Sequence, residues 1–301
     1  MQIGVDWGTS RLRAYLIDDQ GAVVDALESD KGLMHIEAGG YGKVLAEVIA
    51  PWRAKAPRAP VLMAGMVGSR QGWVEAPYAP LPTTLDDLAD ATVVVDAPEI
   101  GDVAIVPGVA AGTEGDGWAD VMRGEETEIF GAMAMLGVRS GTFVLPGSHA
   151  KWVDVADGAI VAFRTFMTGE VFDAVAKHTI LSRMMGEGGD KPDAFARGLT
   201  AARDLEAPGD LLTRLFSIRA ETLFGRLTPE DAPEFLSGLL IGAEVAAGAR
   251  DADKVIVVGA AGLAARYGTA LQAAGVAVVN APPHAAARGL ALLAARRAVM
   301  S

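Results

Sequence analysis

Two short loops carry the residue types that bind phosphate groups. They comprise Gly8, Thr9, Ser10 and Arg11 near the start of the chain, and Gly147, Ser148, His149 and Lys151 in its middle. Glycine lets the backbone approach a phosphate closely, while successive N–H groups and hydroxyls donate hydrogen bonds to its oxygens. Arg11 and Lys151 would add positive charge. Each loop alone could be an ordinary turn, but two of them suit the binding of one polyphosphate from two sides.

A carboxylate precedes the first loop but not the second. Asp6 ends an apolar segment, where it could orient a hydrated Mg²⁺ ion, because Mg²⁺ keeps several waters and takes few carboxylates. Pro146 occupies the corresponding place before the second loop. His149 could be a general base or a loop histidine held by hydrogen bonds. We therefore expect one metal-orienting carboxylate, Asp6, acting through water.

A charged run at residues 123–128 offers candidates for a general base. It reads Arg123-Gly124-Glu125-Glu126-Thr127-Glu128. A solvated helix start also favours acidic residues, because they interact with the positive end of the helix dipole. Glu125 and Glu126 would project about 100° apart on a helix, so one of them could take a proton from a hydroxyl nucleophile. Asp120 and Asp116 are rival bases just upstream.

The segment 65–73 carries polar groups suited to an organic acid or a sugar. The residues concerned are Ser69, Arg70, Gln71 and Trp73. Arg70 could bind a carboxylate through paired hydrogen bonds, the two smaller polar groups could bind hydroxyls, and Trp73 could supply an apolar wall. A surface loop with an exposed arginine is the alternative interpretation.

The elements that position these loops follow the same order twice. A strand, the glycine loop, a second strand, a turn and a third strand are predicted at residues 3–24 and again at 142–161. The spacing is far longer than a solenoid repeat, so we interpret the pattern as a duplicated domain. Apolar spacing further predicts helices over 41–52 and 124–136, four helical segments within 170–250 and a closing helix from His284.

A strand over residues 254–258 leads into Gly259 and Gly262, ahead of another helix. This junction could receive the adenosine part of a nucleotide, but it lacks the Gly-x-Gly-x-x-Gly spacing of a dinucleotide site. The chain also has no Gly-x₄-Gly-Lys-(Ser/Thr) sequence, which excludes a P-loop enzyme. We expect adenosine binding at Gly259 and Gly262.

Composition excludes several classes of protein. The chain has 301 residues, a net charge of −12 and no cysteine. The negative charge argues against a nucleic-acid surface, and the lack of cysteine excludes disulfides, thiolate nucleophiles and cysteine-bound metals. No signal peptide or membrane-spanning run is expected, so the sequence predicts a cytoplasmic protein. Its length and apolar content allow two domains, and a homodimer is compatible with the sequence.

The order of these motifs resembles the sugar kinase/hexokinase/actin superfamily. Within it the chain is similar to the 2-dehydro-3-deoxygalactonokinase family over nearly its whole length. The segments that carry the resemblance are Asp6–Arg11, Ala64–Trp73, Val121–Thr127, Leu145–Trp152 and Phe166–Glu170. The chain departs from the superfamily pattern at Pro146, where an Asp is common, and at Ala260, where a second glycine is usual.

The resemblance implies an α/β fold of two ribonuclease-H-like lobes, with mixed sheets flanked by helices and a cleft between the lobes. It implies an N-terminal lobe of residues 1–131, joined by the closing helix 285–301, and a C-terminal lobe of residues 132–284. It also implies ATP and Mg²⁺, and phosphorylation of the 6-hydroxyl of 2-dehydro-3-deoxy-D-galactonate. Arg123 and Glu170, in the matching segments, become candidates for substrate binding beside the loop 69–73.

The same resemblance orders the candidate bases. A Glu in the corresponding segment of exopolyphosphatases, which share the superfamily, assists attack on phosphorus. This favours Glu126 as the base, then Glu125, with Asp120 as a further candidate. Two other functions stay open on the same fold: an exopolyphosphatase-like phosphohydrolase with water as the nucleophile, or a non-catalytic sensor of a sugar or nucleotide.

Overall fold

The computed structural model describes residues 1–37, 39–113, 117–207 and 209–300 of the chain. They form two compact units. The first comprises Met1–Gly141, Val153–Phe163 and Ala281–Ser301, and the second Thr142–Trp152 and Arg164–Asn280. The candidate base Asp116 lies outside the described residues. Within the described residues, no helix is both long and apolar enough to cross a membrane.

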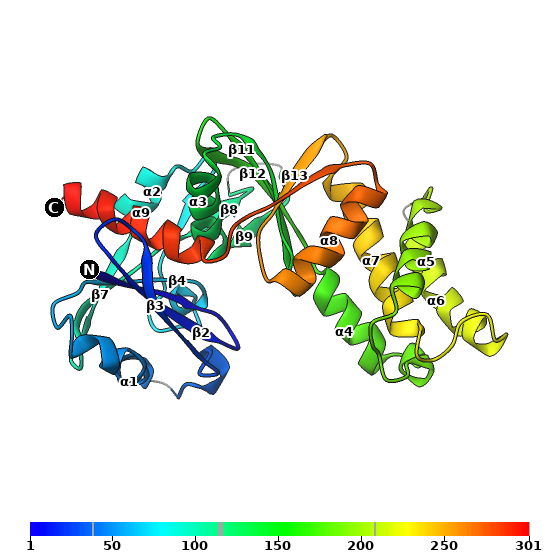
Figure 1. Ribbon diagram of the computed structural model, residues 1–301, viewed down its shortest axis with the longest axis horizontal. Helices are drawn as coiled ribbons and strands as arrows, with labels where there is room; N and C mark the ends of the chain where they lie inside the picture. Colours follow the sequence, from blue (N-terminus) through cyan, green and yellow to red (C-terminus); the bar gives the residue numbers. More distant parts are fainter. Residues whose placement is uncertain (38, 114–116, 208, 301) are drawn as a thin grey trace. The chain divides into compact units, whose positions relative to one another are not determined.

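The first unit is built on a six-stranded mixed sheet (Figure 1) in the order β3-β2-β1-β4-β7-β6. The strands are β1 (Gln2–Trp7), β2 (Leu12–Ile17), β3 (Val23–Ser29), β4 (Val61–Ala64), β6 (Val93–Ala97) and β7 (Gly101–Ile105). The strands β1, β4 and β7 run parallel, and β2 is antiparallel to both β1 and β3. Because the candidate loops leave the ends of β1 and β4, this sheet places them at one edge.

Helices cover both faces of this sheet. Helix α1 (Tyr41–Arg53) buries Leu45, Ile49 and Trp52 against the side chains of Ile3 and Val5. Helix α9 (Ala285–Met300) packs on the other face, where Leu290 lies against Gly4. Side chains alternate between the faces of a strand, which explains why neighbouring residues of β1 meet different helices.

Helix α3 (Glu125–Leu136) lies beside α9 (Figure 1). The two helices approach so closely that a Cβ at Gly131 would lie 1.9 Å from the carbonyl oxygen of Ala285. A Cβ at Gly289 would lie 1.9 Å from the carbonyl oxygen of Thr127. These two glycines therefore fix the position of α3, which carries the candidate base residues.

Smaller elements complete the first unit. A three-stranded sheet contains β5 (Tyr78–Pro80), β8 (Gly108–Ala111) and β9 (Asp120–Met122). Helix α2 (Leu85–Asp90) begins with a capping box between Thr84 and Asp87. The short 3₁₀ turns η1 (Leu33–His35) and η2 (Met66–Gly68) lie beside the ends of β1 and β4.

The other sheet has the strand order β12-β11-β10-β13-β14. Its strands are β10 (Gly141–Leu145), β11 (Ala150–Ala156), β12 (Ala159–Phe166), β13 (Lys254–Val257) and β14 (Ala277–Asn280). Val153–Phe163, which include parts of β11 and β12, belong to the first unit, and β13 and β14 lie in the second. The strand order repeats the β3-β2-β1-β4 order of the first sheet, and β13 is parallel to β10 as β4 is to β1. The predicted duplication is confirmed.

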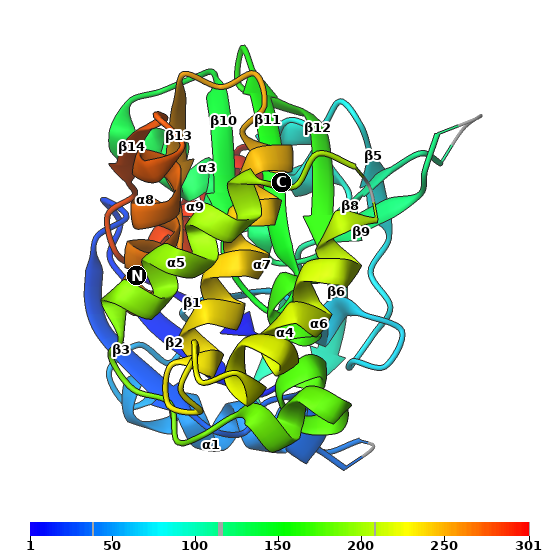
Figure 2. The ribbon, with the colours of Figure 1, turned by 90° about the vertical axis from the view of Figure 1, so that its right-hand side faces the viewer.

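Five longer helices belong to the second unit (Figure 2). They are α4 (Thr168–His178), α5 (Pro192–Arg203), α6 (Asp210–Leu223), α7 (Ala232–Gly248) and α8 (Ala261–Ala273), with a 3₁₀ turn η3 (Ile180–Met184). Helices α5 and α7 cross closely at Gly198. A Cβ at this position would lie 2.2 Å from the carbonyl oxygen of Phe235, so the crossing leaves no room for a side chain there. The four helical segments expected within 170–250 are confirmed as α4 to α7.

Candidate functional site

The first glycine loop connects β1 to β2 in the first unit. Its ends are joined by a hydrogen bond from the Gly8 N–H to the Arg11 carbonyl oxygen, at 2.9 Å. The carbonyl groups of Gly8 and Thr9 accept hydrogen bonds from the backbone of η1. Thr9, Ser10 and Arg11 are exposed, so their donors are free of the core and can meet an anion.

Asp6 lies at the end of β1, where three backbone segments meet. Gly65 has φ = +94°, and a Cβ there would lie 2.8 Å from the Trp7 carbonyl oxygen and 3.3 Å from Asp6 Oδ1. A Cβ at Gly124 would lie 3.1 Å from the Cα of Gly65. At position 65 only glycine adopts this backbone conformation without strain. Because Gly65 has no side chain, the start of α3 can approach the Asp6 carboxylate.

Partly buried carboxylates gather around this point. Burial raises the pKa of Asp6 to about 6, opposed by Arg13 and reinforced by the charge of Glu125. Burial raises the pKa of Glu128 to about 8, reinforced by Asp6 and Glu125. Arg13 Nη1 is 3.7 Å from Asp6 Oδ2. Several acidic groups thus share a region with little water, where like charges raise each other's pKa.

Glu126 is the most buried of these acids. None of its surface is exposed, and its Oε2 accepts a hydrogen bond from the Gly124 N–H at 2.7 Å. The Thr127 hydroxyl donates to Oε1 at 3.0 Å. Burial raises the pKa of Glu126 to about 8, and the Glu125 charge adds to the rise. A carboxylate with this pKa is a strong base near neutral pH.

The other two candidate bases have different surroundings. Glu125 is partly buried and its Oε2 accepts a hydrogen bond from the Arg123 N–H at 2.9 Å. Asp120 lies in β9, where its Oδ1 accepts a hydrogen bond from the Val121 N–H at 2.7 Å. Of the three, Glu126 is the fully buried one, and burial raises its pKa.

Two buried residues of the first unit, Arg123 and Ser69, carry donor atoms without a partner among the described residues. Arg123 is 8% exposed; its Nη2 donates to the Ala76 carbonyl oxygen at 2.8 Å, and its guanidinium carbon is 4.3 Å from the centre of the Tyr78 ring. Within the described residues, neither Nε nor Nη1 of Arg123 has a hydrogen-bond partner, and the same is true of the Ser69 hydroxyl. Buried polar groups without partners are rare, so these donors indicate a ligand with acceptor oxygens.

The rest of the predicted sugar-acid loop faces outward or packs on the core. The Arg70 side chain is 84% exposed, and its Nε lies 3.6 Å from Glu75 Oε1. Gln71 is exposed, and its carbonyl oxygen accepts a hydrogen bond from the Tyr41 hydroxyl. Trp73 stacks on Tyr41 with 6.0 Å between ring centres. Among these loop residues, Ser69 is the buried one.

The second glycine loop connects β10 to β11 and lies against the start of α4. The Glu170 N–H donates to the Ser148 carbonyl oxygen at 3.1 Å, and His149 Nε2 is 2.5 Å from Glu170 Oε2. Lys151 is 6% exposed, and its Nζ donates to the Thr165 hydroxyl at 2.7 Å. Glu170, predicted to bind substrate, therefore lies in the second unit beside His149.

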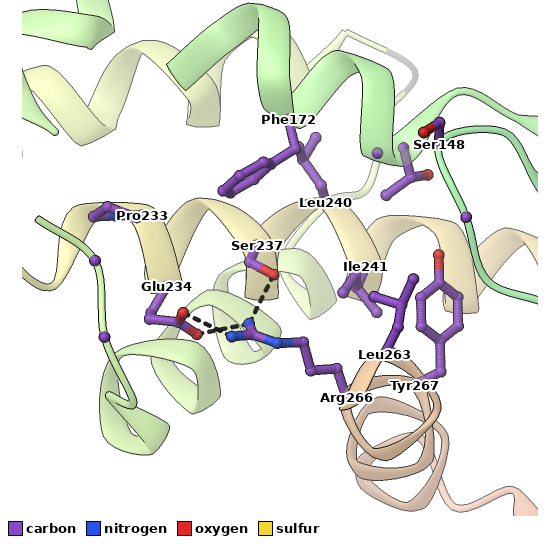
Figure 3. A pocket seen from close by; sticks show the side chains of 15 residues that line it. Ser148, Phe172, Pro233, Glu234, Ser237, Leu240, Ile241, Leu263, Arg266 and Tyr267 are labelled. Carbon is purple, nitrogen blue, oxygen red and sulfur yellow. Dashed lines mark hydrogen bonds and ion pairs between the residues drawn. The ribbon is translucent and has the colours of Figure 1, made fainter. Parts of the chain in front are cut away.

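A cavity of about 700 Å³ adjoins this loop within the second unit (Figure 3). Its walls come from the loop, from α4, α7 and α8, and from residues 188–189. They include Gly147, Ser148, Thr168, Gly169, Phe172, Pro233, Glu234, Ser237, Leu240, Ile241, Leu263, Arg266 and Tyr267. The volume is within the range of small-molecule sites.

One end of the cavity is polar and the middle is apolar (Figure 3). Arg266 donates to both carboxylate oxygens of Glu234, at 2.7 Å each, and to the Ser237 hydroxyl at 3.1 Å. Phe172, Leu240 and Ile241 line the space between this ion pair and Ser148. An apolar slot with a donor-rich glycine loop at one side has the chemistry that a nucleoside phosphate requires.

Gly259 and Gly262, which we predicted to bind adenosine, come just before the residues of helix α8 that line the cavity. Gly259 has φ = +148°, and a Cβ there would lie 3.8 Å from Pro146 Cδ, close to the second loop. At Gly262 a Cβ would meet open space. The cavity walls use the following residues of the same helix, Leu263, Arg266 and Tyr267. Sequence reasoning missed these residues and those of α7, because apolar helical spacing looks the same in a core and in a pocket wall.

The Asp6 region fits a hydrated divalent cation by its donor chemistry. Mg²⁺ prefers carboxylate and water oxygens and uses one or two carboxylates. Among the described residues, no group of three or more His, Cys, Asp or Glu side chains could hold a metal ion by themselves. Burial and the neighbouring Glu125 raise the pKa of Asp6, and this carboxylate would instead contact a cation through a water molecule. The positive charge of the cation would reduce the repulsion among the acidic side chains.

A repeated strand–loop–strand unit beside a parallel strand is typical of the actin-like ATPase fold. The activator of 2-hydroxyisocaproyl-CoA dehydratase from Clostridium difficile, solved with bound ADPNP, has a similar fold. It aligns with a TM-score of 0.52 over 99% of this chain and 96% of its own, at 11% identity. This likeness shows the fold alone.

The family model of 2-keto-3-deoxy-galactonokinase matches residues 6–293, and the chain belongs to this family of carbohydrate kinases. DgoK1 of Rhizobium meliloti (strain 1021), assigned as a 2-dehydro-3-deoxygalactonokinase, is 40% identical over 98% of this chain and 96% of its own. The 2-dehydro-3-deoxygalactonokinase of Escherichia coli (strain K12) is 37% identical over 91% of this chain and 90% of its own. A crystal structure from Sinorhizobium meliloti, assigned to the same activity, aligns with a TM-score of 0.85 and 36% identity, covering 99% of this chain and 97% of that one.

Proposed function

We propose that the chain transfers the γ-phosphoryl group of ATP to the 6-hydroxyl of 2-dehydro-3-deoxy-D-galactonate. Family membership supports the reaction, and one observation in the structure supports the substrate class. Among the described residues, the buried guanidinium of Arg123 and the Ser69 hydroxyl have donor atoms without a hydrogen-bond partner, and both lie in the same unit as Glu126. A sugar acid offers a carboxylate and hydroxyls, which are the acceptors that such donors bind.

In the proposed reaction Glu126 acts as the general base. Its carboxylate takes the proton from the 6-hydroxyl while that oxygen forms a bond to the γ-phosphorus. The bond between the γ-phosphorus and the β,γ-bridging oxygen breaks, and ADP leaves with that electron pair. Glu125 and Asp120 stay as rival bases in this proposal.

The other side chains have binding roles in the proposal. Arg123 and Ser69 bind the sugar acid, with Arg70, Gln71, Trp73 and Glu170 as further candidates. The loops 8–11 and 147–151 bind the phosphates, and Gly259 and Gly262 with the cavity wall of α8 bind adenosine. When bound, Mg²⁺ would neutralise phosphate charge, and Asp6 would orient it through water.

The decisive test is a coupled ADP-release assay with a panel of 2-dehydro-3-deoxy acids and plain hexoses. We expect ADP release that depends on 2-dehydro-3-deoxy-D-galactonate, with little release for hexoses that lack the carboxylate. The rate with the gluconate-derived epimer measures how strongly the enzyme discriminates between two substrates that differ at one hydroxyl. ADP release at the same rate without any sugar acid would instead support the phosphohydrolase, and binding without turnover would support the sensor. Cytoplasmic location and a homodimer stay predictions from the sequence.

A further inference from the structure

One buried carboxylate in the second unit has no part in the reaction described above. Glu244 lies on α7 and is 3% exposed. Its Oε1 accepts a hydrogen bond from Trp152 Nε1 at 2.8 Å, and its Oε2 accepts one from the Tyr267 hydroxyl at 2.7 Å. The Thr168 side chain donates a third bond. One carboxylate therefore joins three donors that lie far apart in the sequence.

Two of these three donors line the nucleotide cavity, and the third follows the second glycine loop. Tyr267 is on α8 and lines the cavity, and Thr168 begins α4 and also lines it. Trp152 follows Lys151 in β11, directly after the second glycine loop. Glu244 thus connects the walls of the cavity to the strand that leaves the loop.

The start of α4 in turn holds the second loop. A Cβ at Gly169 would lie 2.6 Å from the Gly147 carbonyl oxygen, so the two backbones are in close contact. The Glu170 N–H donates to the Ser148 carbonyl oxygen at 3.1 Å. Fixing Thr168 therefore helps to fix the position of the loop whose residues Gly147 and Ser148 line the cavity.

A buried carboxylate is a poor choice for stability alone. Burial raises the pKa of Glu244, and the three donated hydrogen bonds oppose the rise. Well-packed apolar residues often stabilise a core as much as or more than a buried charge does. The benefit of a carboxylate is directional, because its two oxygens accept several hydrogen bonds at fixed angles and so orient their donors.

We propose that Glu244 is a positioning residue for the nucleotide, holding Tyr267 and Thr168 in the cavity wall and, through the start of α4, the second glycine loop. This inference rests on the proposed function, because it takes the cavity as the nucleotide site. It assigns to Glu244 no contact with the nucleotide and no proton transfer. Its loss should therefore weaken nucleotide binding much more than it changes the KM for the sugar acid.

The test measures AMPPNP binding by calorimetry for the full-length wild type and three variants. Glu244→Leu removes the acceptor and should weaken AMPPNP binding by about 10- to 100-fold, as expected for the loss of hydrogen bonds to a buried charged group. Glu244→Gln keeps an acceptor oxygen of the same reach and should stay within about threefold of the wild type. Tyr267→Phe removes one donor and should weaken AMPPNP binding by about three- to tenfold. If Glu244→Leu does not fold, the AMPPNP affinity of Tyr267→Phe tests the inference in its place.

Leu239→Ala is the matched control, since Leu239 is a fully buried residue of the same helix that does not line the cavity. It should lower the unfolding midpoint while leaving AMPPNP affinity within about twofold. The inference is overturned if Tyr267→Phe and Glu244→Leu bind AMPPNP like the wild type, if Glu244→Gln is as weak as the leucine variant, or if the control loses as much affinity. A wild type that binds AMPPNP as described but does not phosphorylate the sugar acid would contradict the proposed function and leave this inference standing.

Discussion

Replacing Glu126 with Gln should slow catalysis and stabilise the protein at the same time. The carboxyl group is fully buried, and its pKa is raised from 4.5 to about 8 by burial first and by Glu125 second. Glutamine has nearly the same shape and can still accept the hydrogen bond from the Gly124 N–H. It cannot take a proton, so kcat should fall by about two to four orders of magnitude.

The effect on stability follows from the same pKa. A carboxyl group with a raised pKa in the folded state favours folding below the pKa of the unfolded chain, and this advantage is lost as the pH rises through about 8. One pKa unit corresponds to about 1.4 kcal/mol, so the rise from 4.5 to about 8 corresponds to at most about 5 kcal/mol. Above pH 8, Glu126→Gln should therefore be more stable than the wild type by up to this amount, whereas at pH 4 the two should be alike.

Urea unfolding of both proteins at pH 4, 6, 8 and 9, together with kcat at pH 8, makes the comparison. Glu47→Gln serves as the control, because Glu47 is an exposed residue of the same unit whose pKa is lowered by its bond to Lys31. The control should leave both the stability and kcat nearly unchanged, because an exposed ion pair contributes little. If Glu126→Gln keeps the wild-type kcat, or if its stability follows the wild type at every pH, the assignment of a buried, strongly basic Glu126 is wrong.

Three further predictions concern the first unit. Arg123→Gln should raise the KM for the sugar acid by about 10- to 100-fold and leave the KM for ATP nearly unchanged, a larger effect than Arg70→Gln; equal effects in steady-state kinetics would contradict the inference from the unpartnered donors. Gly65→Ala should cost about 2 kcal/mol or more in chemical unfolding, because φ is +94° and the Cβ would lie 2.8 Å from the Trp7 carbonyl oxygen; unchanged stability would show that the turn relaxes. In the wild type, kcat/KM should rise with pH and level off near pH 8, as Glu126 loses its proton; a rate that falls over pH 6–8 would exclude that base.

Local patterns were sufficient to predict many helices and strands and their repeat, and the family resemblance implied the fold that they form. The repeated strand–loop–strand segments became β1 to β3 and β10 to β12, and the helix expected over 41–52 is α1, Tyr41–Arg53. Short-range periodicity and glycine turns determine such elements, so one sequence can show them. The lobe boundaries near residues 131 and 284 stay a prediction, because boundaries depend on which distant segments pack together.

The site was less predictable, because burial and long-range pairing decide it. Ser69 and Arg70 are neighbours in one loop, yet Ser69 is 6% exposed and the Arg70 side chain is 84% exposed. No sequence pattern distinguishes them. The pairing of Glu234 with Arg266 and of Glu244 with Trp152 joins residues far apart in the chain, and such pairs follow only from the packed helices.

The central claim is that this chain phosphorylates a sugar acid at its terminal hydroxyl. Phosphorus-31 and carbon-13 NMR of the wild type with ATP, Mg²⁺ and 2-dehydro-3-deoxy-D-galactonate tests it most directly. The account predicts a new phosphate monoester resonance whose phosphorus couples to carbon 6, formed in equal amount with ADP. Inorganic phosphate as the phosphorus product, with the sugar acid unchanged, would contradict it.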